Sequence, residues 1–238
     1  MCMECDKLGL NRRKFLSLSA AGIAASSLAR PAFAQAIART TVTADEAFAR
    51  LKAGNEKFVN APQLCAADLV KQRESVAKAQ APWATILTCS DSRLPPELLF
   101  GGFGVGELFV ARNAGNMADT ATMGTLEYGA EHLEVPLIVV MGHERCGAVI
   151  AACDVVAKRT KLPGSIGPMV NAIVPAAMAV RGKPGDFVEN TVRESAKRTA
   201  TKVATKSEIV SHLIKAGKVK VMAARYGLDD GRVEFLAL

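Results

Sequence analysis

Three runs of apolar residues, almost without polar interruptions, organise the middle of the chain. They cover residues 83–88, 107–111 and 136–141. Runs of this kind are typical of strands in a parallel sheet that is covered by helices on both faces. The segments between them, notably 120–133 and 147–158, are predicted to be helices. The middle of the chain therefore reads as alternating strands and helices.

Helices are also predicted on both sides of this central region. Residues 43–60 begin with Thr43 and, three positions later, Glu46, a spacing that forms a capping box. A further helix is expected over residues 66–79. Residues 185–216 are expected to form one or two amphipathic helices.

The chain ends with two more predicted strands, residues 219–224 and 232–236, on either side of a turn at 229–231. The order of elements is βαβ-like, which predicts an α/β fold with a mostly parallel central sheet flanked by helices. The sequence has no internal repeat and no linker rich in proline or serine. We therefore expect residues 35–238 to form a single domain.

The first 34 residues have the layout of a bacterial secretory signal. A positive stretch with Arg12 and Arg13 precedes a mildly apolar run at 15–28, and residues 32–34 form an A-x-A cleavage site. The paired arginines resemble a twin-arginine (Tat) signal, which exports folded proteins through the Tat machinery. We expect a Tat-type signal peptide at 1–34, a periplasmic or secreted mature protein, and no membrane anchor after cleavage.

Two other interpretations of this segment are a buried N-terminal helix and a retained membrane anchor. The apolar run is shorter than the roughly 20 residues that a membrane span needs, which argues against the anchor. Cys2 and Cys5 form a C-x-x-C pair ahead of the arginines. They would be removed with the signal peptide, so we assign them no function.

Composition narrows the class of protein further. Half of the 238 residues are hydrophobic and 22% are charged, an ordinary globular balance. The net charge of +7 arises from 30 basic and 23 acidic residues that are interleaved, and only 5% of residues are aromatic. This pattern argues against a nucleic-acid groove. Six cysteines are too few for a disulfide scaffold of this length.

The residues that carry chemistry follow two of the predicted strands. Cys89, Asp91 and Arg93 come directly after the first strand, and His143 and Cys146 after the third. In open α/β sheets, ligands bind at the carboxyl ends of the strands. Two thiolates and one imidazole suit a tetrahedral zinc ion, with a fourth position for a carboxylate or a water molecule.

Each of these features is weak by itself. A single buried cysteine is usually just a small apolar residue, and an aspartate two positions from an arginine is usually a surface pair. Their order and placement strengthen the prediction, since C-x-D-x-R and H-x-x-C-G both lie where an apolar strand ends.

This combination resembles the β-class carbonic anhydrases. The resemblance extends over most of residues 43–238 and includes four further segments, at 106–113, 127–129, 189–192 and 226–231. It implies the β-carbonic anhydrase fold and a zinc enzyme that interconverts CO2 and bicarbonate. It also implies a homodimer or a higher homo-oligomer.

The resemblance also implies roles for individual residues. The zinc ligands would be Cys89, His143 and Cys146, and Asp91 and Arg93 would form the catalytic dyad, with Asp91 a zinc ligand only in a closed state. Four further residues would contact the substrate. Gln80 would reach it from across the dimer interface, Phe109 and Tyr128 would form an apolar lining, and Gly147 follows the second cysteine.

Some features fall outside this pattern. Ile86 stands where one branch of the family carries tryptophan, which puts that branch's second, inhibitory bicarbonate site in doubt here. Surface or capping roles are expected for His132 and His212, with proton transfer as the alternative. Cys65 and Cys153 are expected to be structural thiols.

Two alternative functions stay open at the level of sequence. The same scaffold hosts hydrolases of carbon disulfide and carbonyl sulfide. A non-catalytic zinc-binding or bicarbonate-sensing protein would use a closed site of two cysteines, a histidine and an aspartate. The complete dyad argues against this second alternative, because a structural zinc needs no Arg93.

Overall fold

The computed structural model describes residues 39–60, 69–101 and 104–238. The expected signal peptide at 1–34, together with Cys65, lies outside these residues. Among the described residues, no helix is both long and apolar enough to cross a membrane.

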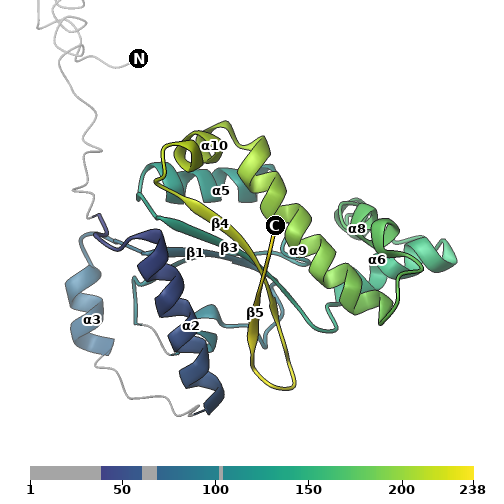
Figure 1. Ribbon diagram of the computed structural model, residues 1–238, viewed down its shortest axis with the longest axis horizontal. Helices are drawn as coiled ribbons and strands as arrows, with labels where there is room; N and C mark the ends of the chain where they lie inside the picture. The colour runs from purple at the N-terminus through teal and green to yellow at the C-terminus, as the bar shows by residue number, and fades with distance from the viewer. Residues whose placement is uncertain (1–38, 61–68, 102–103) are drawn as a thin grey trace, which may run out of the picture. The chain divides into compact units, whose positions relative to one another are not determined.

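A five-stranded sheet forms the centre of the fold, in the order β2-β1-β3-β4-β5 (Figure 1). Its first four strands in that order are parallel, and the last runs antiparallel to β4. The strands are β1 (Ala84–Thr88), β2 (Leu108–Arg112), β3 (Leu137–His143), β4 (Lys220–Tyr226) and β5 (Val233–Leu236). The predicted mostly parallel α/β fold is confirmed.

Nine helices surround this sheet in the described part of the chain. They are α2 (Ala44–Asn60), α3 (Leu69–Val76), α4 (Pro96–Leu99), α5 (Thr120–Glu131), α6 (Gly147–Lys158), α7 (Ile166–Asn171), α8 (Val174–Val180), α9 (Phe187–Lys206) and α10 (Glu208–Lys215).

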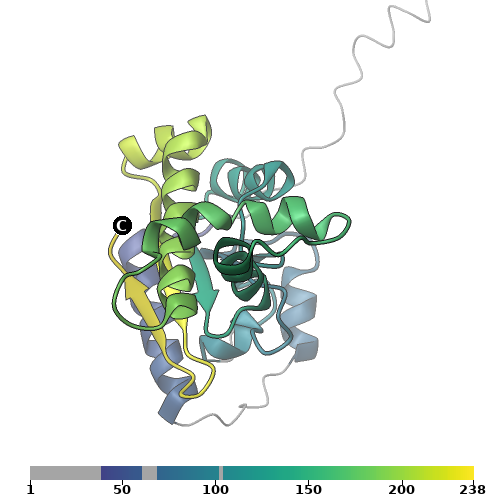
Figure 2. The same cartoon turned by 90° about the vertical axis from the view of Figure 1, so that its right-hand side faces the viewer.

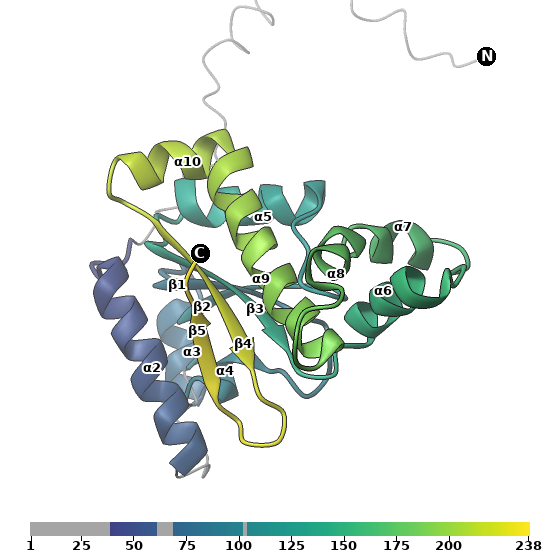
Figure 3. The ribbon, with the colours of Figure 1, turned by 45° about the vertical axis from the view of Figure 1, so that its right-hand side comes forward.

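The two faces of the sheet carry separate hydrophobic cores. Leu87 and Val140 pack on one face with side chains from α5, α9 and α10. Ile86 and Val139, their neighbours along the strands, pack on the opposite face with side chains from α2 and α4. Figure 3 shows α9 lying across β3 and β4, with α2 on the other side of the sheet. Both faces of β1 and β3 are therefore buried, which explains their lack of polar alternation.

A third cluster of buried apolar residues lies beside the sheet rather than on it. Helices α6, α7 and α8 pack together and against α9, and this cluster includes Cys89 and Cys146. Figure 2 shows these green helices grouped next to α9. The cluster lies at the carboxyl ends of β1 and β3, where the predicted ligands lie.

Local signals in the sequence explain where several helices begin. The predicted capping box is present, because the Thr43 N–H donates to Glu46 Oε2 (2.8 Å) and the Glu46 N–H donates to Thr43 Oγ1 (3.3 Å). Residues 185–216 form two helices, since Ser207 ends α9 and caps α10 through the Val210 N–H (3.1 Å). Helices α4, α7 and α8 were not predicted because they have at most seven residues each.

Asn55 joins three parts of the fold from a position that the sequence did not single out. Its side chain is buried in α2 and donates to the carbonyls of Leu99 (3.0 Å) and Gly231 (2.8 Å). Its Oδ1 accepts from the Val233 N–H (2.8 Å). Helix α2 is thereby tied to the end of α4 and to the start of β5.

Replacement of Asn55 by alanine is expected to lower the free energy of unfolding by about 2–4 kcal/mol, because one buried and two part-buried backbone groups lose their partner. Chemical denaturation of the purified variant measures this loss. The matched control is Asn190→Ala, which removes one exposed hydrogen bond to Pro184 O (2.9 Å). An Asn55→Ala variant no less stable than the control would contradict the role given to Asn55.

Candidate metal centre

The parallel pairing of β1 with β3 places the two chemical motifs at one edge of the sheet. Thr88 pairs with Met141, so Cys89 follows the end of β1 while β3 continues for two more residues to His143. The Thr88 hydroxyl also donates to the Met141 carbonyl (3.0 Å). The sequence-predicted ligands from the two strands therefore meet across one strand pair.

Cys89, His143 and Cys146 form a buried group whose ligand atoms all lie within 4.8 Å of one another. The two sulfur atoms are 4.0 Å apart. The three residues are at most 6% exposed. The tight turn at Glu144 and Arg145, where Arg145 has a φ of +51°, brings Cys146 back beside His143.

The imidazole of His143 is held so that one nitrogen can bind a metal. Its Nδ1 lies 2.8 Å from the carbonyl of Glu144, which makes Nδ1 the protonated nitrogen. Its Nε2 is buried without a hydrogen-bond partner among the described residues. Buried polar atoms are rarely left unpaired, so this lone pair is suited to a metal ion.

The two thiols shift each other's pKa because their sulfur atoms are close together. The pKa of Cys89 is lowered chiefly because Cys146 donates a hydrogen bond to its sulfur, and the Gly115 N–H donates a further one (3.5 Å). The pKa of Cys146 is raised because it is the donor in that bond, because it is buried and because a thiolate lies next to it. Two adjacent thiolates thus require a cation, and a divalent ion with sulfur and nitrogen ligands fits these residues.

Cys146 also lies at a favourable place for a thiolate, immediately before α6. The N–H groups at the start of a helix and its dipole favour negative charge, and the Val149 and Ala148 N–H groups offset a small part of the rise in the pKa of Cys146. Gly147 is the first residue of α6, and a Cβ atom at this position would meet nothing within 4 Å. The space in front of the helix is therefore open at Gly147.

Asp91 and Arg93 form a forked ion pair beside this group. Arg93 Nε and Nη2 donate to Asp91 Oδ1 (2.9 Å) and Oδ2 (2.7 Å), and the Arg93 N–H donates to Oδ1 (3.0 Å). These hydrogen bonds hold the pKa of Asp91 well below its usual range. Asp91 Oδ2 is 4.0 Å from His143 Nε2, so the ionised carboxylate lies close to the unpaired nitrogen.

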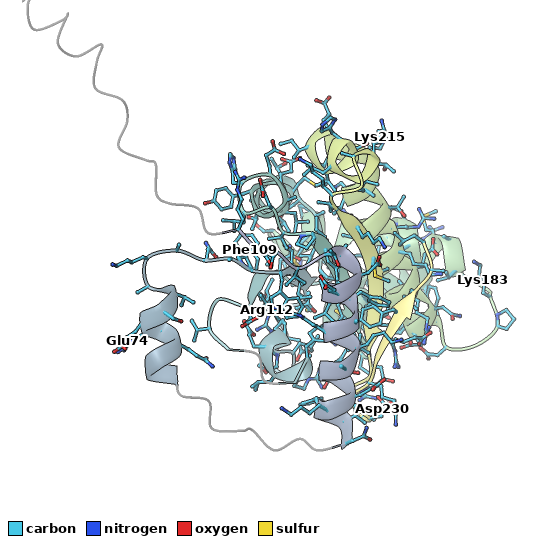
Figure 4. The ribbon with its side chains drawn as sticks, turned by 60° about the vertical axis from the view of Figure 1, so that its left-hand side comes forward. Glu74, Phe109, Arg112, Lys183, Lys215 and Asp230 are labelled. Carbon is cyan, nitrogen blue, oxygen red and sulfur yellow. The ribbon has the colours of Figure 1, made fainter. Side chains whose placement is uncertain are left out.

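Arg112 at the end of β2 shapes the loop that carries Cys89 and Asp91. Its Nε donates to the Cys89 carbonyl (3.0 Å) and its Nη2 to the Asp91 carbonyl (2.5 Å). Figure 4 labels Arg112 and Phe109, which belong to the same strand. The sequence did not predict this role of Arg112, because its hydrogen bonds join residues more than 20 positions apart.

The chain is similar in sequence to proteins of one known family. Residues 84–233 match the family model described as carbonic anhydrase. Carbonic anhydrase 2 of Mycobacterium tuberculosis is 35% identical over 186 residues, which cover 78% of this chain and 89% of the relative. The chain belongs to the carbonic anhydrase family.

Other carbonic anhydrases share both sequence and fold with the chain. The carbonic anhydrase of Mycolicibacterium smegmatis is 34% identical over 79% of this chain and 91% of the relative. The structure of a Coccomyxa β-carbonic anhydrase in complex with acetazolamide is 26% identical, with a TM-score of 0.61 over 83% of this chain and 87% of that one. The expected β-carbonic anhydrase fold is confirmed.

The residues expected to meet the substrate are distributed differently from the metal-binding group. Phe109 and Tyr128 lie near each other, with ring centroids 6.3 Å apart, and Tyr128 is 48% exposed. Gln80 is exposed and precedes the amino end of β1, whereas Cys89 follows its carboxyl end. Within one chain, Gln80 therefore lies at the opposite end of β1 from the metal-binding group of this carbonic anhydrase.

The remaining two histidines are exposed on helices of the surface, whereas Cys153 is buried. His132 is the C-cap residue of α5 and packs on Tyr128 (5.2 Å between ring centroids). His212 lies in α10 and lines a cavity of about 500 Å³ at the opposite end of β3 and β4 from His143. Cys153 is buried in α6 and donates to Thr191 Oγ1 (3.4 Å), and its burial raises its pKa.

The geometry predicts that Cys146→Ser will lose most of its bound zinc. A serine hydroxyl is not deprotonated at neutral pH and cannot replace the thiolate at the start of α6. Elemental analysis of purified protein after dialysis measures zinc per chain. The matched control is Cys153→Ser, another buried cysteine of α6, which is expected to keep its zinc. Full zinc content in Cys146→Ser would show that the ligand assignment is wrong.

Proposed function

We propose that this member of the carbonic anhydrase family holds one zinc ion on Cys89, His143 and Cys146 and catalyses the reversible hydration of CO2 to bicarbonate and a proton. The observation that carries this proposal is the unpaired Nε2 of His143, buried beside two thiols and a forked Asp91–Arg93 pair. The metal-binding group and the ionised carboxylate are thereby adjacent.

A bound zinc ion would supply a Lewis acid that makes water more acidic. Asp91 is ionised and close to His143 Nε2, so it is placed to accept a hydrogen bond from the attacking water and to orient that water toward the CO2 carbon. The proton released by hydration passes to solvent. Arg93 keeps Asp91 ionised and directs its oxygens, since both oxygens already accept bonds from the guanidinium.

The same pair accounts for a closed state of the site. If Arg93 released Asp91, the carboxylate would be free to take the fourth ligand position and exclude water. The 4.0 Å between Asp91 Oδ2 and His143 Nε2 makes this a short movement. A permanently closed, non-catalytic zinc site would need no guanidinium fork, so the fork favours an enzyme over a structural or bicarbonate-sensing protein.

We further propose that the working form is a homodimer or a higher homo-oligomer in which the partner completes the substrate pocket. A structural neighbour from Sordaria macrospora is a tetrameric β-carbonic anhydrase, with a TM-score of 0.62 at 22% identity over 78% of this chain and 91% of that one. Gln80, Phe109 and Tyr128 are partly or well exposed in the single chain. Packing of a second subunit over them would bring the Gln80 amide to the other subunit's site and keep the pocket apolar.

The enzyme assignment predicts that Asp91→Asn and Arg93→Ala lower the rate of CO2 hydration by at least about 10²-fold and about 10-fold, respectively, while zinc content stays near one per chain. Stopped-flow measurement with a pH indicator gives the rate on zinc-loaded protein. The control is Arg198→Ala, which breaks an exposed pair with Glu194 on α9.

Wild-type turnover in either dyad variant would contradict the catalytic role of the pair. The same assay with carbonyl sulfide and carbon disulfide distinguishes a carbonic anhydrase from the alternative hydrolase. The hydrolase would turn over one of these substrates faster than CO2. The names of the curated relatives favour CO2.

Export by the twin-arginine route is a separate proposal, supported by Arg12, Arg13 and the A-x-A site at 32–34. The chemistry of the centre supplies an independent reason for this route. Free thiolates exposed to an oxidising compartment would be oxidised or mispaired, whereas folding and zinc loading in a reducing cytoplasm protect Cys89 and Cys146 first.

Changing both Arg12 and Arg13 to lysine is therefore expected to leave an active, uncleaved precursor in the cytoplasm. Cell fractionation with immunoblotting measures the size and location of the protein, and a strain without the Tat translocase serves as the reference. Normal amounts of cleaved periplasmic enzyme in the lysine variant would reject the Tat route.

A further inference from the structure

A chain of ion pairs leads away from the turn that joins two of the proposed zinc ligands. Glu144, which follows His143, pairs with Arg225 of β4, and Arg225 also pairs with Glu189 of α9. Glu189 in turn accepts from Arg193 Nε (2.9 Å), whose other nitrogens form a fork with Glu234 of β5. The chain connects the ligand turn to three separate elements.

Glu144 is the residue through which this network reaches a ligand. Its carbonyl lies 2.8 Å from His143 Nδ1 and so fixes the tautomer and the orientation of the imidazole. Its N–H donates to the Tyr226 carbonyl (3.0 Å), and its Oε2 accepts from the Leu228 N–H (2.8 Å). The position of this one backbone carbonyl therefore depends on how firmly Glu144 is held against the end of β4.

Arg225 is the nearer and more buried of two cations beside the Glu144 side chain, the other being Arg145 (3.8 Å). Arg225 lies opposite Gly142 in the β3–β4 pairing, one residue before His143. Its side chain is only 14% exposed, with Nη2 on Glu144 Oε1 and Nε on Glu189 Oε1 (2.8 Å). Glu144 is itself about one-fifth exposed, so its charge is poorly solvated and needs this partner.

We propose that Arg225 is a positioning residue for the zinc centre, which it stabilises through Glu144 and the His143 ring without touching the ligands. This inference rests on the proposed zinc site. Without Arg225, Glu144 would keep a largely buried negative charge whose remaining partners are the Leu228 N–H (2.8 Å) and the half-exposed Arg145 guanidinium, with Nη2 at 3.8 Å from Oε2. The carboxylate would then move toward solvent, and the turn would move with it, so that the carbonyl no longer fixes the imidazole.

The test is the rate at which full-length, zinc-loaded protein releases zinc to an excess of a chromogenic chelator. Arg225→Gln is expected to release zinc about 10–100-fold faster than the wild type, in line with the loss of metal affinity that follows when the group orienting a metal ligand is disturbed. Arg225→Lys keeps a cation but reaches only one carboxylate, so an intermediate rate is expected. The visible spectrum of the cobalt-substituted protein should also change in Arg225→Gln.

Arg193→Gln is the matched control, because it removes two ion pairs of the same network one link farther from the turn. Its zinc release should stay within about 2-fold of the wild type even if its thermal stability falls. Equal acceleration in Arg193→Gln and Arg225→Gln would show a general loss of stability and overturn the proposal. No acceleration in Arg225→Gln would overturn it as well.

A double-variant comparison tests the route through Glu144. Once Glu144→Gln has removed the charge, adding Arg225→Gln should accelerate zinc release by less than about 3-fold. An undiminished effect of Arg225→Gln in that background would show that Arg225 acts by another route. Failure of the wild type to bind one zinc per chain would instead refute the zinc site itself, so the two failures are distinguishable.

Discussion

The parallel pairing of β1 with β3 is the constraint on which the site depends. Cys89 is 54 positions before His143 in the sequence, and only the adjacent carboxyl ends of these strands bring the two together. Packing fixes the register of this pair, because both strands are buried on both faces and a slip by one residue would put each side chain into the opposite, differently shaped core. The same cores that stabilise the sheet therefore fix the separation of the proposed ligands.

The pairing of β1 with β3 brings several negatively charged groups together, and the rest of the site balances part of their charge. Two thiols and Asp91 lie together at the strand ends, and the fold surrounds them with N–H groups, the start of α6 and guanidinium groups. Arg93 neutralises Asp91, while Arg112 and Arg225 hold the two loops that carry the ligands. The charge of the two thiolates would still have to be balanced, which is the role proposed for a divalent cation.

The sequence predicted those parts of the structure that leave a local pattern. The five strands, the capping box at Thr43 and Glu46 and the C-x-D-x-R and H-x-x-C motifs were all found in this way, and the fold is confirmed. Asn55 and Arg225 left no such pattern, since their partners lie between 36 and 178 positions away. The role of Gln80 could not be derived from one chain, because it depends on a second subunit.

We propose above all that one metal ion binds between the ends of β1 and β3. X-ray absorption at the zinc edge of the purified protein can decide this, because it reports the atoms bound to the metal. We expect two sulfur ligands at about 2.3 Å together with nitrogen or oxygen ligands at about 2.0–2.1 Å. A shell with one sulfur or none, or with four sulfurs, would contradict it.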